Sequence, residues 1–168
     1  MNRAKRDRLF ADALRDHAGL VARVARSYEA DAARCEELRQ DIALALWRAL
    51  PAFRGEASLA TFVARIAHNR GIDHMLARQR DPQGAALAED WPDPLPEPVQ
   101  RVEIGERQSR LLAAIRTLPL GMRQVVTLAL EGFSHQEIAS VLDIETNAVD
   151  ARLSRARRRL RDLLGDPS

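Results

Sequence analysis

Arginine side chains recur along one predicted helix near the carboxyl end of the sequence, from Arg152 to Arg161. Guanidinium groups donate hydrogen bonds to phosphate oxygens and to guanine edges. Asn147, at the start of the same helix, carries an amide that can pair with adenine through two hydrogen bonds. An arginine-rich helix end is also common as a solvated face that suits the helix dipole, so charge alone does not decide. The combination of residue types favours recognition of nucleic acid.

Two predicted helices with a tight break between them would position these side chains, over residues 132–164. Ser134 and Glu137 have the spacing of a capping box, which starts a short helix. The apolar pattern stops at Asp143 and then restarts with alternating steps of four and three, typical of one helix face. The residues expected on that face are Val149, Leu153, Ala156, Leu160 and Leu163. A short capped helix, a turn and a longer basic helix predict a DNA-reading helix-turn-helix.

The composition indicates a globular helical protein. The 168 residues suffice for one domain or two small ones, with 46% hydrophobic and only 4% aromatic residues. The net charge of +2 is small, and acidic residues gather around 31–41 and 89–103 while the carboxyl end is basic. The single cysteine, Cys35, excludes an internal disulfide and fits a reducing compartment; a small helix residue is favoured there over a redox switch.

Three helices are predicted in the first 80 residues. The first covers 10–28, and the second covers 36–50 after a polar turn at 31–34, with Leu38, Ile42, Leu46 and Leu50 facing inward. The third runs from about Ser58 to about Arg80. Its expected apolar side consists of Phe62, Ile66, Ile72 and Met75.

Five of the eight prolines lie in residues 81–98, which predicts a linker over 81–99. The linker separates a domain over 1–80 from a domain over 100–168. Helices are predicted over 99–117 and 120–131, ahead of the helix-turn-helix. The sequence carries no alternating strand pattern, so we predict an all-α fold of two small helical domains.

The sequence offers no catalytic set, metal site or cofactor motif. It lacks a glycine-rich phosphate loop, a nucleophile elbow and a cysteine–histidine cluster. The four histidines, at positions 17, 68, 74 and 135, are interpreted as helix-surface or boundary residues. The amino-terminal segment has no apolar run of a signal peptide, and no stretch reaches membrane-spanning length. We therefore expect a cytoplasmic protein that is not an enzyme and does not insert into membranes.

Two separate stretches of the chain resemble the extracytoplasmic-function (group IV) sigma factors of bacterial RNA polymerase, within the sigma-70 family. Residues 36–80, EELRQDIALALWRALPAFRGEASLATFVARIAHNRGIDHMLARQR, are similar to the family's region 2. Residues 115–160, which include GFSHQEIASVLDIETNAVDARLSRARRRL, are similar to its region 4. The resemblance implies three partners: the core polymerase, through its β′ clamp helices and β flap, promoter DNA, and an anti-sigma factor.

The resemblance implies a polymerase-binding surface on the second predicted helix. The residues at the family's clamp-docking positions are Glu37, Leu38, Gln40, Asp41 and Leu44. Carboxylates and an amide beside an apolar side chain suit a basic partner helix. The alternative is a solvated acidic helix face.

The resemblance further implies that the loop FRGEAS and the third helix open the promoter and capture an unpaired base of the −10 element. The candidate residues are Arg54, Ser58, Thr61, Phe62, Arg65, Asn69, Arg70, Asp73 and Arg78. Phe62 stands where the family usually has tryptophan, and it serves equally well as a core residue. Residues 78–80 are less basic than the family's arginine run, which predicts weaker phosphate contact.

For the −35 element, the resemblance implies that the second helix of the helix-turn-helix enters the major groove. The candidate residues are Ser134, His135, Thr146, Asn147, Asp150, Arg152, Arg155 and Arg158. Three positions depart from the family. Asp143 replaces a turn glycine, Glu145 replaces a Ser or Thr cap, with Thr146 expected to cap one residue later, and Asp150 replaces lysine. The last change loses a phosphate partner, so we expect weaker or unusual −35 recognition.

Two other functions compete with this interpretation. A response-regulator-type transcription factor shares such a helix-turn-helix, but it requires an alternating β/α domain that residues 1–80 do not predict. A helical adaptor that binds only protein does not account for the basic surfaces. Salt-sensitive DNA binding separates the adaptor from the DNA-binding alternatives.

Overall fold

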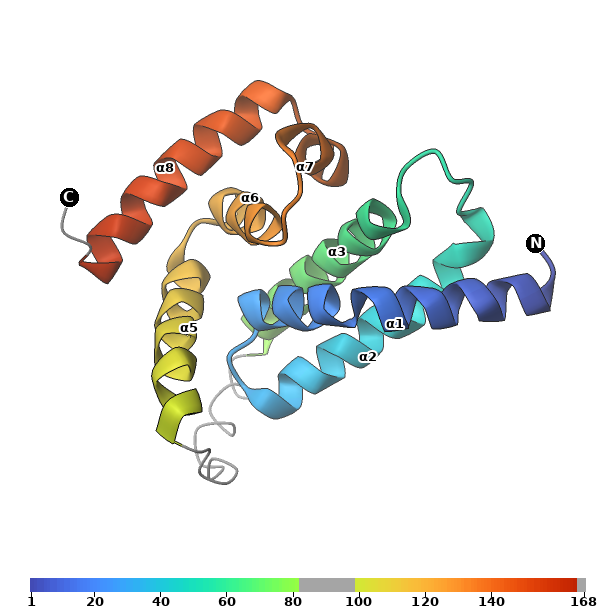
Figure 1. Ribbon diagram of the computed structural model, residues 1–168, viewed down its shortest axis with the longest axis horizontal. Helices are drawn as coiled ribbons and strands as arrows, with labels where there is room; N and C mark the ends of the chain where they lie inside the picture. Colours follow the sequence, from blue (N-terminus) through green and yellow to red (C-terminus); the bar gives the residue numbers. More distant parts are fainter. Residues whose placement is uncertain (82–98, 166–168) are drawn as a thin grey trace.

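The computed structural model describes residues 1–81 and 99–165, and in these ranges the chain consists of helices joined by short loops, with no strand (Figure 1). The prediction of an all-α fold is confirmed. The predicted linker lies almost entirely outside the described residues. The helices are α1 (Arg3–Tyr28), α2 (Ala32–Ala49), η1 (Leu50–Ala52), α3 (Leu59–Arg80), α5 (Val99–Thr117), α6 (Leu120–Leu130), α7 (His135–Leu142) and α8 (Thr146–Leu164).

Side-chain caps explain where the first helices begin. The side chain of Asn2 accepts a hydrogen bond from the backbone N–H of Lys5 at 2.8 Å, so α1 begins earlier than the apolar pattern indicates. Asp31 accepts from the N–H of Arg34 at 2.9 Å, and α2 therefore begins at Ala32. The predicted turn over 31–34 is wrong, because the polar residues there form a capped helix start.

Helices α1, α2 and α3 pack together around one core, and the side chains that α3 contributes to its centre are small. Leu38, Ile42, Leu46 and Leu50 are buried as predicted. On α3, however, the fully buried apolar residues are Val63, Ala64 and Ala67. The four larger residues predicted for this face, Phe62, Ile66, Ile72 and Met75, are only partly buried. Because α1 and α2 both pack against α3, small residues occupy the line of closest approach and larger ones flank it.

The last four helices form the second packed unit, in which α8 contacts α5, α6 and α7. Val149, Leu153 and Ala156 are buried on α8, as the spacing predicts. Leu163 was expected on the same face, but it is 56% exposed. The packing of α8 against its neighbours ends near Leu160, and periodicity specifies a face without specifying how far along the helix that face is covered.

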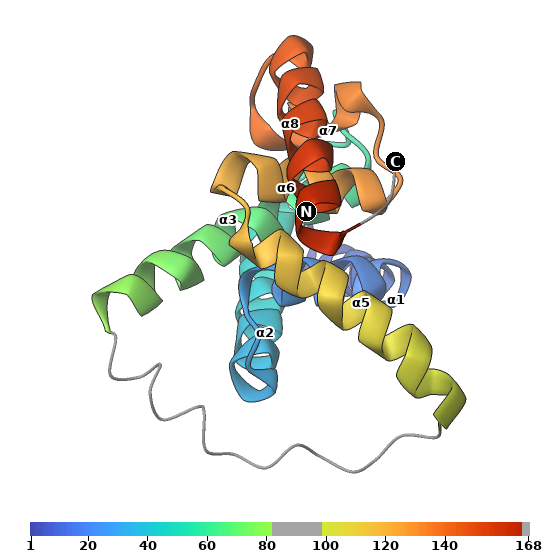
Figure 2. The same cartoon turned by 90° about the vertical axis from the view of Figure 1, so that its left-hand side faces the viewer.

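The two units lie side by side (Figures 1 and 2). Helix α1 contacts α5 and α6, and α3 contacts α7. Buried apolar residues of both units belong to one continuous cluster. Within the described ranges, no helix is both long and apolar enough to cross a bilayer.

Candidate nucleic-acid interface

The helix-turn-helix is formed by α7 and α8, and its capping box is present as predicted. Ser134 Oγ accepts from the N–H of Glu137 at 3.1 Å, while the Glu137 carboxylate accepts from the N–H of Ser134 at 2.7 Å. Asp143 ends α7 in the left-handed conformation, with φ of 54° and ψ of 52°. Asp143 thus takes the backbone conformation that glycine usually supplies at such a turn.

The start of α8 differs from the prediction. The backbone N–H groups of Ala148 and Val149 both donate to the carbonyl of Glu145, which makes Glu145 the N-cap residue. Glu145 makes no side-chain capping bond, and Thr146 is the first residue inside the helix. The expectation that Thr146 caps α8 is therefore wrong.

The outer side of α8 carries most of the residues proposed to read the −35 element. Thr146, Asn147, Asp150, Arg155 and Arg158 are exposed there. Arg152 is half-buried, and its guanidinium lies against α6, since a Cβ atom added at Gly121 would lie 3.3 Å from it. His135, at the start of α7, reaches Asp150 with an Nδ1–Oδ1 distance of 2.6 Å.

The start of α3 and the preceding loop form a shallow recess. Its lining includes Phe53, Arg54, Phe62 and Arg65. The rings of Phe53 and Phe62 lie 4.9 Å apart, so aromatic surface contributes to the recess. Partly exposed aromatic rings and guanidinium groups suit an unpaired base and its phosphate, while the Glu56 carboxylate, which also lines the recess, opposes phosphate.

Two residues proposed for the −10 element have structural partners at this end of α3. Ser58 caps the helix by accepting from the N–H of Thr61 at 3.1 Å, and its hydroxyl contacts the Thr61 hydroxyl at 3.0 Å. Thr61 is buried. Its observed contacts are those of a helix start, whereas Ser58 remains exposed.

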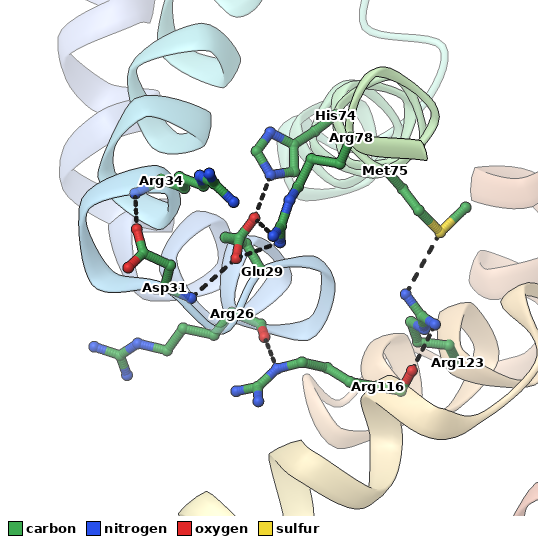
Figure 3. Close-up of polar contacts among 9 residues, drawn as sticks. All are labelled: Arg26, Glu29, Asp31, Arg34, His74, Met75, Arg78, Arg116 and Arg123. Atoms are coloured by element: carbon green, nitrogen blue, oxygen red, sulfur yellow. Dashed lines mark hydrogen bonds and ion pairs between the residues drawn. The ribbon is translucent and has the colours of Figure 1, made fainter. Parts of the chain in front are cut away.

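Farther along α3, Asn69 and Asp73 are exposed, and Arg70 contacts Asp73 at 3.1 Å. Arg78 instead turns toward the buried Glu29, as Figure 3 shows, and donates to its two oxygens at 2.8 and 2.6 Å. This ion pair holds the last turn of α3 against the end of α1.

Glu29 also contacts His74 Nε2 at 2.7 Å and accepts from the N–H of Asp31 at 2.9 Å. Burial opposes ionisation of Glu29, but the hydrogen bonds and the charge of Arg78 outweigh it and lower the pKa of the carboxyl. His74 is 15% exposed at its side chain, so it is a boundary residue and not a plain surface histidine. The contact with the Glu29 carboxylate explains the low exposure of the His74 imidazole.

Four of the five proposed polymerase-binding residues are exposed, and one is buried. Glu37, Gln40 and Asp41 are exposed on α2, and Leu44 is 46% exposed beside them. Leu38 is buried in the core of the first unit, where it packs between helices. Leu44 is therefore the apolar side chain that this surface offers to a partner.

A series of buried hydrogen bonds connects the first unit to the second. Tyr28 Oη lies 2.8 Å from His68 Nδ1 and accepts from Gln124 Nε2 at 3.2 Å. His68 is 2% exposed, so its interpretation as a helix-surface or boundary histidine is wrong. Burial lowers the pKa of His68 to about 3 and raises the pKa of Tyr28 to about 12, so both side chains are neutral.

Arginine side chains make further contacts between the units. Arg23 donates to both oxygens of Glu131, and Arg116 Nε donates to the carbonyl of Arg26 at 2.9 Å. Arg123 Nη1 lies 3.7 Å from the sulfur of Met75 (Figure 3). Arg65 Nη2 donates to the carbonyl of Ser140 at 2.8 Å. The sequence does not predict this interface, because no local pattern indicates which polar residues from separate helices will be in contact.

Two further observations concern reactive side chains in the described part of the chain. Cys35 is buried, and burial raises the pKa of its thiol, which disfavours the reactive thiolate. Among the described residues, no group of three or more histidine, cysteine and acidic side chains is arranged to hold a metal ion.

Comparison with known proteins assigns both units. Residues 13–81 match the model of sigma-70 region 2, and residues 108–160 match that of sigma-70, region 4. The chain belongs to the sigma-70 family. Its relatives place it in the extracytoplasmic-function group, as the resemblance implied. It is thus a transcription initiation factor and not an enzyme.

Three relatives illustrate this similarity. The RNA polymerase sigma-H factor of Pseudomonas aeruginosa is 30% identical over 83% of this chain and 75% of its own length. The sigma factor CnrH of Cupriavidus metallidurans is 28% identical over 94% of this chain and 87% of its own length. The sigma factor NccH of Alcaligenes xylosoxydans is 29% identical over 92% of this chain and 86% of its own length.

Two solved structures have the same fold. CnrH in complex with the cytosolic domain of CnrY matches with a TM-score of 0.67 and 26% identity, over 96% of this chain and 91% of that one. RpoE of Bartonella quintana, in complex with the anti-sigma factor NepR, matches with a TM-score of 0.73 and 21% identity, over 95% of this chain and 98% of that one.

Proposed function

We propose that this chain is an alternative sigma factor that binds core RNA polymerase and directs it to promoters with particular −10 and −35 elements. The observation that supports this proposal is that one chain presents two separate surfaces whose side chains suit contacts with DNA. One is the recess between the FRGEAS loop and α3, and the other is the outer side of α8. The surface of α2 around Leu44 is proposed to dock on the β′ clamp helices, and the second unit on the β flap.

The role assigned to the first surface is capture of an unpaired base. Phe53 and Phe62 supply stacking area, while Arg54 and Arg65 supply donors for phosphate. Asn69 and Arg70 continue this surface along α3. Since Arg78 is engaged by Glu29, its proposed role is to hold α3 in place, and the phosphate contacts fall to the exposed residues nearer the loop.

The packed arrangement of the two units is proposed to be the unbound form. Arg65 lines the recess and is hydrogen-bonded to Ser140 of α7. This bond joins the two units that are proposed to read DNA. A chain that contacts two elements separated along the promoter must separate these units. We expect polymerase and DNA to supply the free energy for this opening.

Control by a protein partner, an anti-sigma factor, is part of the proposal. The relative CnrH was solved in complex with the cytosolic domain of CnrY, so binding of a second protein occurs in a structure of the same fold. A partner that stabilises the packed arrangement would keep the proposed polymerase and DNA surfaces from acting. The chain is proposed to act in the cytoplasm, where the polymerase is located.

The test is transcription with purified bacterial core RNA polymerase on a pool of promoter fragments. We expect specific start sites only when this chain is added. Gln40→Ala combined with Asp41→Ala should abolish them, because these exposed side chains form the proposed clamp-binding surface. A matched control is Arg15→Ala, which changes an exposed ion pair within α1 and should leave transcription intact.

A different outcome of this experiment would contradict the proposal. If the chain binds duplex DNA in a salt-dependent manner but never associates with core polymerase, the sigma-factor proposal is wrong. A free-standing helix-turn-helix regulator would then be the better account.

A further inference from the structure

Asp150 and His135 form a polar pair on the DNA-facing side of the helix-turn-helix. Asp150 follows the buried Val149 and lies three residues after Asn147, on the exposed side of α8. His135 Nδ1 lies 2.6 Å from Asp150 Oδ1. The two side chains are 50% and 54% exposed. Among the described residues, no other group bonds to this carboxylate, so Oδ2 remains an available acceptor.

A carboxylate at this position has few favourable contacts on DNA. Phosphates repel it, and most groups in the major groove are acceptors. The exceptions are the amino groups of cytosine and adenine. Adenine places its N7 acceptor beside N6, which opposes a carboxylate, whereas cytosine N4 has no acceptor next to it on the major-groove edge. An aspartate in the groove therefore selects cytosine.

We propose that Asp150, held by His135, reads a cytosine of the −35 element. This inference rests on the proposed function, in which α8 enters the major groove. Asp150 is then a specificity-determining residue, and the loss of a lysine at this position changes the preferred base. His135 is a positioning residue, because its imidazole holds one carboxylate oxygen and leaves the other directed to the base.

The pair could instead serve only to join α7 to α8. The packing of Ile138 and Val141 with Val149 and Leu153 already joins these helices through buried apolar side chains. An exposed polar pair adds little stability to such packing. Substituting either residue should therefore leave the melting temperature nearly unchanged, and the effect should fall on base preference.

The test measures base preference with the reconstituted polymerase holoenzyme and a promoter library randomised across the −35 element. We expect the unmodified chain to prefer cytosine about tenfold at one position. Asp150→Ala should remove this preference and leave the other positions unchanged. Asp150→Asn should shift it toward adenine, since an amide pairs with both N6 and N7.

The role of His135 is tested in the same library. His135→Ala should weaken the cytosine preference severalfold, and His135→Asn, which keeps a donor near the position of Nδ1, should restore part of it. Asp162→Asn is the matched control, because Asp162 is an exposed aspartate near the other end of α8. Its profile should equal that of the unmodified chain.

Two results separate the possible failures. If Asp150→Ala leaves the profile unchanged or weakens all sequences equally, the inference is wrong while the sigma-factor proposal stands. If the holoenzyme with the unmodified chain shows no −35 preference at all, the assignment of α8 to the major groove is wrong as well.

Discussion

Arg65 of α3 donates from Nη2 to the backbone carbonyl of Ser140 in α7, at 2.8 Å. This hydrogen bond joins the unit proposed to read the −10 element to the helix-turn-helix proposed to read the −35 element. Arg65 cannot keep this contact and also reach a phosphate away from α7. The packed arrangement thus occupies a residue that promoter binding is expected to use.

The first prediction concerns opening of the packed arrangement. Arg23→Ala removes the partner of Glu131, whose side chain is only 8% exposed, and leaves that carboxylate without its ion pair at the interface. We expect the open form to become about fivefold more populated. Small-angle X-ray scattering should show a larger radius of gyration, and core polymerase should bind more tightly by a similar factor.

Arg15→Ala serves as the control for this experiment, since Arg15 pairs with Asp12 and Asp16 on its own helix. Its scattering curve should match that of the unmodified chain. An unchanged radius and unchanged polymerase affinity in Arg23→Ala would show that the ion pair does not hold the units together.

A second prediction concerns the close approach of Tyr28 to α3. A Cβ atom added at Gly71 would lie 2.4 Å from the Tyr28 ring, and Tyr28 is held by hydrogen bonds on both sides. Gly71→Ala should therefore destabilise the fold by about 1–3 kcal/mol, measured by denaturant unfolding. Gly105→Ala adds a Cβ that meets nothing within 4 Å in α5 and should stabilise by about 0.5–1 kcal/mol. Equal effects of the two substitutions would contradict this account.

Local patterns predicted most of this architecture, and tertiary partners account for the failures. The capping box at Ser134 and Glu137 and the left-handed Asp143 depend on neighbouring residues, so the sequence indicates them. His68 and Glu29 depend on partners 40 to 49 residues away, namely Tyr28 in one case and His74 and Arg78 in the other. Composition and periodicity carry no signal for such pairings, so the sequence alone does not predict that these two side chains are buried.

The same distinction applies to the candidate site. The exposed residues of α8 follow from helix geometry, and α8 presents Asn147, Asp150 and Arg155 as expected. The contact between His135 and Asp150 required the relative placement of α7 and α8. A sequence comparison treats Asp150 as the loss of a lysine, whereas the structure gives it a partner.

A third prediction concerns the turn between α7 and α8. Asp143 has φ of 54°, a conformation that costs free energy for residues with a Cβ atom. Asp143→Gly should stabilise the chain by up to about 1 kcal/mol, and Asp143→Ala should destabilise it by about the same amount. Thermal unfolding of the three proteins gives the order directly. If the glycine variant is the least stable, the Asp143 side chain contributes more than its backbone conformation costs.

The last prediction concerns the pH dependence of stability. The pKa of His68 falls from an ordinary value of 6.5 to about 3 in the folded chain, because burial disfavours the charged imidazole. The unfolded chain therefore binds a proton below pH 6.5 that the folded chain does not bind. The contribution of neutral His68 is fully present above pH 6.5 and is lost progressively as the pH falls toward 3. We expect the free energy of unfolding to fall by roughly 1 kcal/mol for each pH unit through the middle of this range.

Measurement between pH 5 and 6.5 isolates this effect from that of Glu29. The pKa of Glu29 lies below its ordinary value of 4.5, so the stability that its ionised form contributes is lost only at lower pH. His68→Asn keeps a polar side chain near Tyr28 without an imidazole and should reduce the slope of the free energy of unfolding with pH in the window. Arg15→Ala changes an exposed ion pair within α1 and should retain the slope. If the slope persists in His68→Asn, another group is responsible, and a buried neutral histidine does not govern acid stability.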